Sequence, residues 1–432
     1  MEIRPFRGWR YSGDAGDVSS YIAPPYDVLN QQDKDNLLSR SEQNIVAVDM
    51  PYVPPKELGP EEVYRQAAER LKQWQADGVL VQDDRPAVYA YEQTYSWAGK
   101  TYSRRAMLCG VRATALGEDV IPHEHTFAGP KADRLRLTEC TGVQLSPIFG
   151  FFDDAGGVSE TLWSAARGAP TIQGKLRDVH EKLWVIDDEA VIAKIAAALA
   201  DRPVFIADGH HRYTTAMNYA TELRKSGRID EKHEANFVMF CLVARSDPGL
   251  LVLPTHRMVR GLKEGFSVEA LAESLPEFTW KRCSVDEANL ADADAFLRKY
   301  GSGAMAFIGA HPAEIWVGRL NDPKAMAELA PDECEEWRRL DVAILHRLVI
   351  DKALAAWKTD QTALEYTPDG RAVMAACKAG SIDLGVCMQG TPLEAVEAIA
   401  NRGASMPHKS TYFYPKLATG MVIKPLELGT GD

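Results

Sequence analysis

The residues with the clearest chemical potential lie where an apolar run meets the start of an amphipathic helix. Asp208, Gly209, His210, His211 and Arg212 follow one another at this point. When a strand, a tight turn and the beginning of a helix follow one another in that order, the helix N-terminus presents unpaired N–H groups and the positive end of its dipole. The segment therefore predicts a phosphate or carboxylate site in which Gly209, both histidines and Arg212 bind the anion.

Two of these residues have more specific roles open to them. Gly209 would let the backbone approach the anion closely, and Asp208 would hold a metal ion or orient a histidine. Asp208 and His210 are also candidate catalytic groups. The alternative is an ordinary turn in which Asp208 caps the helix and the histidines are solvated.

A second cluster contains His123, Glu124 and His125. In an extended chain the two histidines point to the same side and could chelate a metal, whereas Glu124 could act as a general base. Lys131 and Arg134 open the helix that follows, so we expect them to neutralise phosphate charge. The alternative is a surface loop that leads into a helix.

A third cluster lies in residues 405–417, where Lys409, Ser410 and Lys416 occur among tyrosines and prolines. The segment is too polar for a core strand, and loops of this kind often bind ligands. We expect Lys409 and Ser410 to contact the phosphates. A rigid surface loop explains the same pattern equally well.

Two shorter segments bring polar groups to the ends of stiff or apolar stretches. Pro24 and Pro25 fix the chain ahead of Asp27, which is a further candidate base. His256 and Arg257 follow an apolar run, where site residues commonly emerge. A packed proline-rich edge and a structural histidine are the respective alternatives.

The elements that must position these groups mix helix and strand periods. A helix is expected over residues 60–79, and a hairpin over 87–97 and 100–113. The remaining expected strands are 183–186, 204–207, 237–244, 250–254, 278–283, 304–310, 314–320 and 382–388. The remaining expected helices are 190–199, 213–224, 288–299, 340–357 and 393–401.

This order predicts a mixed α/β (α+β) protein, because the strands are spaced too irregularly for a TIM barrel or a simple doubly wound sheet. We expect an N-terminal α/β region over residues 1–230 and a C-terminal one over 231–432. No P-loop, Gly-x-Gly-x-x-Gly, His-Glu-x-x-His or Gly-x-Ser-x-Gly motif occurs.

Composition limits the partners. The 432 residues are 46% hydrophobic and 25% charged, which is typical of globular chains, and the net charge of −12 argues against nucleic acid as a partner. No apolar run approaches the roughly 20 residues of a membrane span, so we expect no membrane association and a cytoplasmic location. The seven cysteines have no metal-site or redox spacing, which favours reduced thiols.

Taken together, five motifs resemble the bacterial domain-of-unknown-function family 1015 over nearly the whole chain. The motifs are residues 24–28, 123–134, 207–213, 247–257 and 406–416. A narrower resemblance concerns Asp208 to Arg212, which is similar to the phosphate motif of the ParB/sulfiredoxin fold and of the free-serine kinases built on it. That resemblance implies a ParB/sulfiredoxin-like nucleotide-binding core with additional α/β elements.

The resemblance and the cations together predict a kinase that transfers a phosphoryl group from ATP or ADP, with Mg²⁺, to the hydroxyl of a small polar metabolite such as free L-serine. Glu124 is the expected base, with Asp27 and Asp208 as competitors, and Asp208 and His123 are the expected metal contacts. A homodimer is compatible with the sequence.

Two other functions remain open. One is a metal-dependent hydrolase of an anionic or phosphorylated small molecule, with His123, His125, Asp208 and His210 as ligands. The other is a non-catalytic ParB-like nucleotide-binding module.

Overall fold

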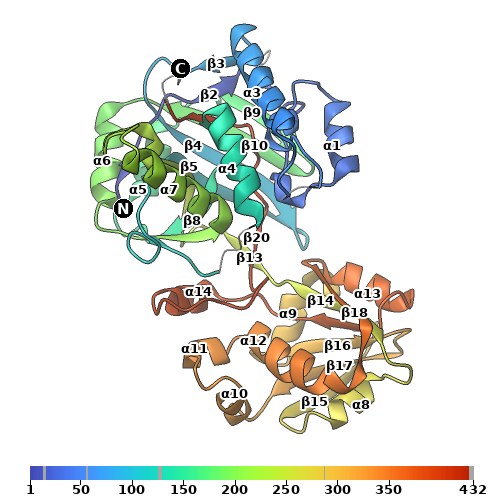
Figure 1. Cartoon of the computed structure of the whole chain (residues 1–432). Coiled ribbons are helices and arrows are strands. Elements are labelled where there is room, and N and C mark those ends of the chain that lie inside the picture. The colour runs from blue at the N-terminus through green and yellow to red at the C-terminus, as the bar shows by residue number, and fades with distance from the viewer. Residues whose placement is uncertain (13–15, 55–56, 125–128, 287, 428–432) are drawn as a thin grey trace. The chain divides into compact units, whose positions relative to one another are not determined.

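The computed structural model describes residues 1–12, 16–54, 57–124, 129–286 and 288–427, and it forms two compact units (Figure 1). Unit 1 combines Met1–Leu250 with the C-terminal residues from Pro415, and unit 2 is Leu251–Tyr414. The boundary expected at residues 230/231 falls inside unit 1, because the strand that follows it belongs to the middle of the unit 1 sheet.

Unit 1 is built on a nine-stranded mixed sheet whose main path runs β6-β11-β8-β12-β5-β4-β10-β9, with β1 paired to β5. Its strands are β1 (Ile3–Arg4), β4 (Val88–Trp97), β5 (Lys100–Arg112), β6 (Val120–Ile121), β8 (Ile148–Phe152), β9 (Ile172–Leu176), β10 (Val179–Ile186), β11 (Val204–Asp208) and β12 (Phe237–Ala244). The β4–β5 hairpin has the expected turn, with Trp97 paired to Lys100. The mixed α/β class is confirmed.

Helices and short strand pairs complete unit 1. They are β2 (Trp9–Tyr11), η2 (Tyr26–Val28), α1 (Gln31–Leu38), α2 (Val46–Asp49), α3 (Glu61–Ala76), β3 (Leu80–Gln82), α4 (Gly129–Thr141), β7 (Val143–Gln144), α5 (Val158–Ala165), α6 (Glu189–Leu199), α7 (His210–Lys225), η3 (Glu234–Asn236) and β21 (Lys424–Pro425). Apolar side chains of α5, α6 and α7 pack with the sheet in one core. Helix α4 lies against both α3 and α7.

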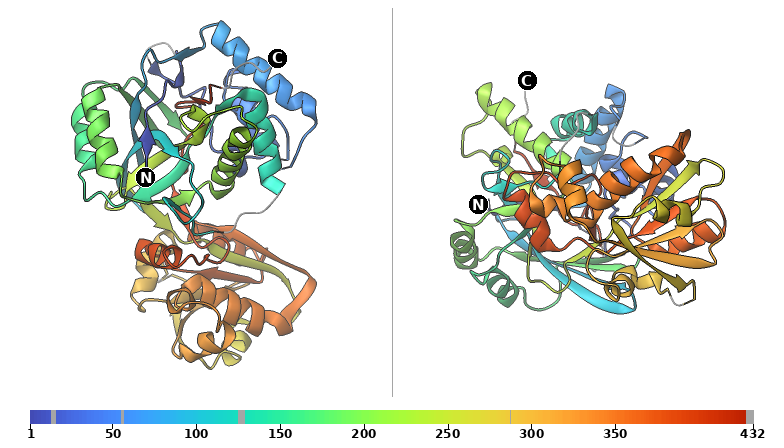
Figure 2. Two further views of the ribbon diagram at one scale, coloured as in Figure 1. Left: turned by 60° about the vertical axis from the view of Figure 1, so that its left-hand side comes forward. Right: turned by 90° about the horizontal axis from the view of Figure 1, so that it is seen from below.

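The two faces of the unit 1 sheet differ in character. Val88 and Ala90 of β4 belong to the apolar core. Because successive strand residues point to opposite faces, Tyr91 and Gln93 point the other way. The C-terminal segment, dark red in Figures 1 and 2, runs back among the blue and green elements of unit 1 and contacts both side chains.

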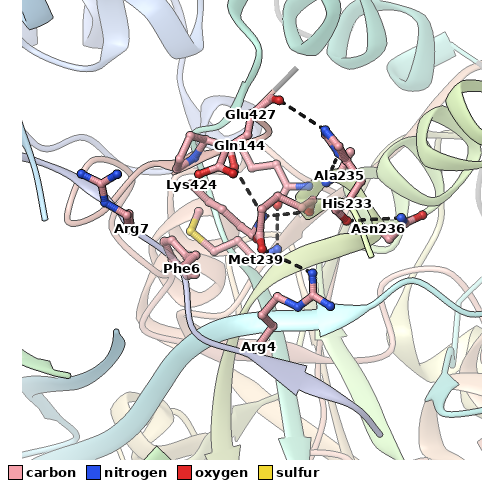
Figure 3. Close-up of polar contacts among 12 residues, drawn as sticks. Arg4, Phe6, Arg7, Gln144, His233, Ala235, Asn236, Met239, Lys424 and Glu427 are labelled. Atoms are coloured by element: carbon pink, nitrogen blue, oxygen red, sulfur yellow. Dashed lines mark hydrogen bonds and ion pairs between the residues drawn. The ribbon is translucent and has the colours of Figure 1, made fainter. Parts of the chain in front are cut away.

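A buried lysine anchors the end of this returning segment (Figure 3). Lys424 pairs with Gln144 across β21 and β7, and its ammonium donates to the backbone oxygen of Glu234 over 3.0 Å. Gln144 in turn accepts a hydrogen bond of 2.6 Å from the backbone N–H of Met239 in β12. The segment is therefore part of unit 1, although all of unit 2 precedes it in the chain.

Unit 2 is built on a six-stranded antiparallel sheet in the order β15-β17-β16-β19-β14-β18, with β13 and β20 paired separately. Its elements are β13 (Leu251–Leu253), β14 (His256–Leu262), α8 (Val268–Glu273), β15 (Phe278–Ser284), η4 (Leu290–Asp292), α9 (Ala293–Arg298), β16 (Met305–Gly309), β17 (Glu314–Leu320), α10 (Lys324–Leu329), α11 (Glu335–Arg338), α12 (Asp341–Ile344), η5 (Leu345–Lys352), η6 (Ala353–Trp357), β18 (Lys358–Thr367), α13 (Gly370–Lys378), β19 (Leu384–Cys387), α14 (Leu393–Ala400) and β20 (Tyr412–Tyr414).

Three expected elements of unit 2 differ from the structure. The helix expected over 288–299 begins only at Ala293, because Asp292 caps it by accepting from the N–H of Ala295. The helix expected over 340–357 becomes a π-helix from Leu345. The segment expected as an irregular loop contains a short strand, β20, which pairs with β13 and not with the core sheet. Among the described residues, no helix is long and apolar enough to cross a membrane.

Candidate functional site

The predicted strand–turn–helix is present at the end of β11. Buried apolar side chains form β11 up to Ala207, and Gly209 then takes a left-handed φ of 98° that turns the chain into α7. No side chain caps the start of α7, and its first turn holds no acid. The 16-residue helix therefore presents N–H groups and the positive end of its dipole at the turn.

Gly209 is required here for two reasons. Its φ is one that residues with a Cβ rarely adopt. A Cβ at this position would also lie 3.1 Å from Arg212 Nη2 and 3.2 Å from Ile148 Cδ1. The turn is thus open to an anion only while residue 209 has no side chain.

A lysine from the returning C-terminal segment meets Asp208. Lys416 Nζ lies 2.9 Å from Asp208 Oδ2, and Asp208 Oδ1 accepts from the N–H of Gly209 over 2.9 Å. Burial raises the pKa of Asp208, but the charges of Lys416 and Arg212 outweigh burial and hold that pKa well below its ordinary value. Asp208 is therefore a stable carboxylate.

His123 and His210, which meet beside the turn, are neutral. His123 and His210 lie edge to face with ring centroids 4.7 Å apart, and the N–H of His123 donates to His210 Nε2 over 3.3 Å. Burial lowers the pKa of His123 to about 4 and the pKa of His210 well below its usual range. The sequence alone predicts that His210 binds phosphate and helps to neutralise its charge. Its burial instead leaves it an uncharged hydrogen-bonding group.

A row of buried polar residues across three strands positions Lys416. Glu181 of β10, Gln93 of β4 and Arg104 of β5 are direct cross-strand neighbours. Gln93 Nε2 donates to Glu181 Oε1 over 3.1 Å and to the backbone oxygen of Lys416 over 3.2 Å, and its Oε1 accepts from Arg104. Arg104 also donates to the oxygen of Pro415 over 2.7 Å. The row therefore holds the backbone on both sides of the Pro415–Lys416 peptide bond.

The second predicted cluster reaches the same region through Arg134. Its guanidinium is buried, lies between Asp49 and Asp133 at 3.2 and 2.6 Å, and lies 3.8 Å from the ring centroid of Tyr26. Two carboxylates thus already neutralise this arginine, which differs from its expected role as a phosphate contact. Burial raises the pKa of Asp49 despite the nearby arginines.

Arg212 and Arg134 line one small cavity of about 60 Å³ between α4 and α7, together with Asp49, Ser146 and Thr215. That volume admits a few water molecules and is too small for a nucleotide base. Arg212 differs from Arg134 in its partners. It donates to the backbone oxygen of Pro147 over 2.7 Å, and no carboxylate of the described residues lies within ion-pair distance of it.

Other predicted residues lie in several different places. Asp27 is half-buried in η2, and its charge acts on Tyr26 and Asp49, which places it in the Arg134–Arg212 region. Glu124 is half-buried next to His123, and Lys131 is half-buried in the first turn of α4. His125 lies outside the described residues. Lys409 and Ser410 belong to unit 2 and are described with it below.

Over the part of the chain that the structure describes, no group of three or more His, Cys, Asp or Glu side chains is arranged to hold a metal ion. Sequence reasoning did not assign Lys416 a contact, and it missed Gln93, Arg104, Glu181 and Asp49. The sequence offered no clear signal for the three strand residues, because each adjoins another charged residue in its strand: Glu92, Arg105 and Lys182.

Comparison with known proteins bears on family and fold. The model of the family described as "Protein of unknown function (DUF1015)" matches residues 3–343. No curated protein is similar enough to match the chain. Among solved structures, a conserved hypothetical protein from Pyrococcus furiosus is 14% identical over 73% of this chain and 95% of its own, with a TM-score of 0.32.

Two further solved structures have comparable similarity. A free serine kinase in complex with AMP is 13% identical over 73% of this chain and 92% of its own, with a TM-score of 0.32. SbnI with a C-terminal truncation, from Staphylococcus aureus, is 11% identical over 75% of this chain and 90% of its own, with a TM-score of 0.35.

Proposed function

The chain belongs to the DUF1015 family of proteins of unknown function, and we propose that its unit 1 is a phosphotransferase. It binds the phosphates of ATP or ADP at the β11–α7 turn and transfers a phosphoryl group to the hydroxyl of a small polar metabolite, of which free L-serine is the first candidate. The observation that carries this proposal is the uncapped start of α7 beside two cations, Arg212 and Lys416.

Phosphoryl transfer depends mainly on positioned positive charge, and the turn provides it. Arg212 can bind two phosphate oxygens at once because its charge is not taken up by a carboxylate. The N–H groups at the start of α7 would bind a further oxygen, and His210 and His211 would donate hydrogen bonds there. Lys416 would contribute a point charge on the other side of Asp208.

Asp208 fits the role of a Mg²⁺ contact. Mg²⁺ is commonly held by one or two carboxylates plus the phosphates of the substrate, and Asp208 is an ionised carboxylate at the phosphate site. When bound, the ion would neutralise charge on the phosphate oxygens. His123 is a weaker candidate, because its ring is buried against His210.

Three carboxylates compete to be the base that accepts the proton of the acceptor hydroxyl. Asp208 is the weakest of them as a base, because Lys416 and Arg212 hold its pKa low. Glu124 remains our assignment, because it adjoins His123 and thereby the His210 ring at the turn. Asp27 is the competitor, because its charge acts on Tyr26, as the charge of Arg212 also does.

The test is a screen of the whole chain with Mg²⁺ and either ATP or ADP against L-serine and other small hydroxyl compounds, followed by phosphorus NMR. We expect a new phosphomonoester signal with one donor. Glu124→Gln should abolish that signal while nucleotide binding persists, and the exposed Glu118→Gln serves as its matched control.

Two outcomes would change the proposal in different ways. If Asp27→Asn abolishes transfer and Glu124→Gln does not, Asp27 is the base and the rest of the proposal stands. If no product forms and neither ATP nor ADP binds to the wild-type chain at millimolar concentration, the phosphotransferase proposal fails.

A further inference from the structure

A buried arginine of unit 2 has no acidic partner. Arg257 of β14 is 0% exposed, and no carboxylate of the described residues lies within ion-pair distance of it. Its N–H groups donate instead to the backbone oxygens of Thr255 and Lys409 and to His346 Nε2, which is 3.1 Å from Nη2. A buried charge is normally paired with an opposite charge, so Arg257 is unusual in donating only to backbone oxygens and an imidazole among the described residues.

The same arginine fixes a loop with two exposed basic side chains. Arg257 Nη2 lies 3.4 Å from the backbone oxygen of His408 and 3.1 Å from that of Lys409. Lys409 has a left-handed φ of 59°, which is uncommon for a residue with a Cβ and is a strained conformation. Thr391 Oγ1 adds a hydrogen bond of 2.9 Å to the oxygen of Ser410. The loop therefore holds a strained conformation that presents His408 and Lys409 to solvent.

The electrostatic surroundings of His346 are basic. Burial is the largest cause that lowers the pKa of this imidazole to about 4. The charges of Arg257, His408, Lys358 and Arg347 lower it in the same direction. One of these cations, Lys358, has an acid nearby, at 3.9 Å from Asp351. The region thus carries more positive than negative charge, although the chain as a whole is acidic.

A hydroxyl next to Arg257 is also without a partner. Thr255 Oγ1 is buried and makes no hydrogen bond among the described residues, and Thr255 itself is 3% exposed. An unbonded buried hydroxyl is costly, and it is commonly explained by a missing water, ion or ligand. Two independent observations, an unpaired cation and an orphan hydroxyl, therefore fall within three residues of each other.

We propose that unit 2 binds a small phosphate dianion at the Arg257 cluster, which consists of Arg257, His346, His408 and Lys409. His408 and Lys409 would contact the phosphate from the solvent side, and the buried Arg257 would supply charge from beneath. Several cations with one acid nearby suit a dianion better than a single carboxylate. This proposal does not depend on the phosphotransferase proposal for unit 1.

The test follows the histidine rings of the whole chain by NMR while inorganic phosphate is added at constant ionic strength. Arg212→Ala is the background, because it removes the principal phosphate contact that we propose in unit 1. A bound anion favours the imidazolium, so we expect the pKa values of His346 and His408 to rise by about one unit. The exposed His180 and His311 are internal controls and should not change.

A pair of lysine variants makes the test specific. Lys409→Ala removes an exposed side chain and should weaken phosphate binding about tenfold. Lys378→Ala removes an equally exposed charge elsewhere in unit 2 and should leave binding unchanged. Arg257→Met should abolish binding if the variant folds, but the test does not depend on it.

Glycerol 3-phosphate as a second probe distinguishes the source of the phosphate group. Equal or tighter binding of the ester assigns the site to phosphomonoesters, and binding of inorganic phosphate alone assigns it to the free ion. The proposal is overturned if phosphate shifts His346 and His408 only when Arg212 is intact, if it shifts neither at tens of millimolar, or if Lys378→Ala weakens binding as much as Lys409→Ala.

Discussion

Arg134 and Arg212 line the same cavity, and both belong to segments whose composition predicts phosphate binding, yet their environments are opposite. Arg134 is buried between Asp49 and Asp133. Arg212 donates to one backbone oxygen, and its charge acts on Asp208 without direct pairing. The first arginine stabilises the packing of α4, and the second has charge available for a ligand.

The comparison teaches that an arginine buried between two carboxylates is committed to packing, whereas an arginine with no paired carboxylate among the described residues keeps its charge for a ligand. Buried ion pairs contribute little net stability, but removal of one partner leaves an uncompensated charge and is strongly destabilising. A partly exposed cation without an acid can be removed at small cost to folding. Substitutions of the two arginines should therefore affect different properties of the protein.

The largest effect is expected from Arg134→Met. This change leaves Asp49 and Asp133 buried without their counter-charge, so we expect unit 1 to lose about 3–5 kcal/mol of unfolding free energy. Urea unfolding followed by tryptophan fluorescence measures the loss. A second variant, Arg134→Lys, keeps the charge and should recover part of the stability. Wild-type stability in Arg134→Met would remove the basis of the comparison.

The next prediction concerns Glu181, a buried carboxylate that accepts a hydrogen bond from the amide of Gln93. Burial raises the pKa of Glu181 to about 7, compared with about 4.3 in an unfolded chain. The folded state therefore binds the proton more tightly, and this contribution to stability is lost as the pH rises from about 4.3 to about 7. Relative to Glu181→Gln, the wild-type protein should lose about 3 kcal/mol over that interval.

The measurement is urea unfolding of both proteins at pH 4.5, 6 and 7.5, where the difference between them isolates Glu181 from other titrating groups. A difference that does not change with pH would contradict the raised pKa. Glutamine keeps an oxygen that can accept from Gln93, which in turn holds the Lys416 backbone, so Glu181→Gln should leave nucleotide affinity at low pH unchanged.

A smaller effect in free energy, but a larger one for function, is expected from Arg212→Ala. Loss of charge-assisted hydrogen bonds to phosphate should weaken ATP or ADP binding about 10- to 100-fold, while the urea midpoint stays near that of the wild type. Isothermal calorimetry measures the affinity. Arg224→Ala, in the last turn of the same helix, is the matched control, and an equal loss there would remove Arg212 from the site.

How far the sequence predicts this region depends on the range of the interactions. The strand, turn and helix around Asp208 to Arg212 occur in the predicted order, because each is determined by neighbours in the chain, although α7 begins at His210 and not at residue 213. The hairpin at β4 and β5 was predicted for the same reason. Helix α13 was missed, and so was strand β18, none of whose side chains is fully buried and whose pattern lacks a clear apolar face.

The contacts within the candidate site could not be predicted from the sequence, because they join residues that are far apart in the chain. Lys416 and Asp208 are 208 positions apart, and their pairing requires the chain to leave unit 1, form unit 2 and return. The row of Glu181, Gln93 and Arg104 depends on the register of three strands, which alternation alone does not specify. Whether Arg134 is compensated depends on Asp49, which lies on a different helix.

The smallest expected effect comes from Arg136, which lies two residues after Arg134 on α4. It too contacts two carboxylates, Glu61 and Glu139, but all three side chains are substantially exposed. Water solvates the carboxylates when the arginine is removed, so Arg136→Ala should leave the urea midpoint unchanged within error. If Arg136→Ala instead destabilises unit 1 as much as Arg134→Met does, the number of ion pairs and not their burial determines the cost. Burial would then no longer explain why the loss of Arg134 is costly.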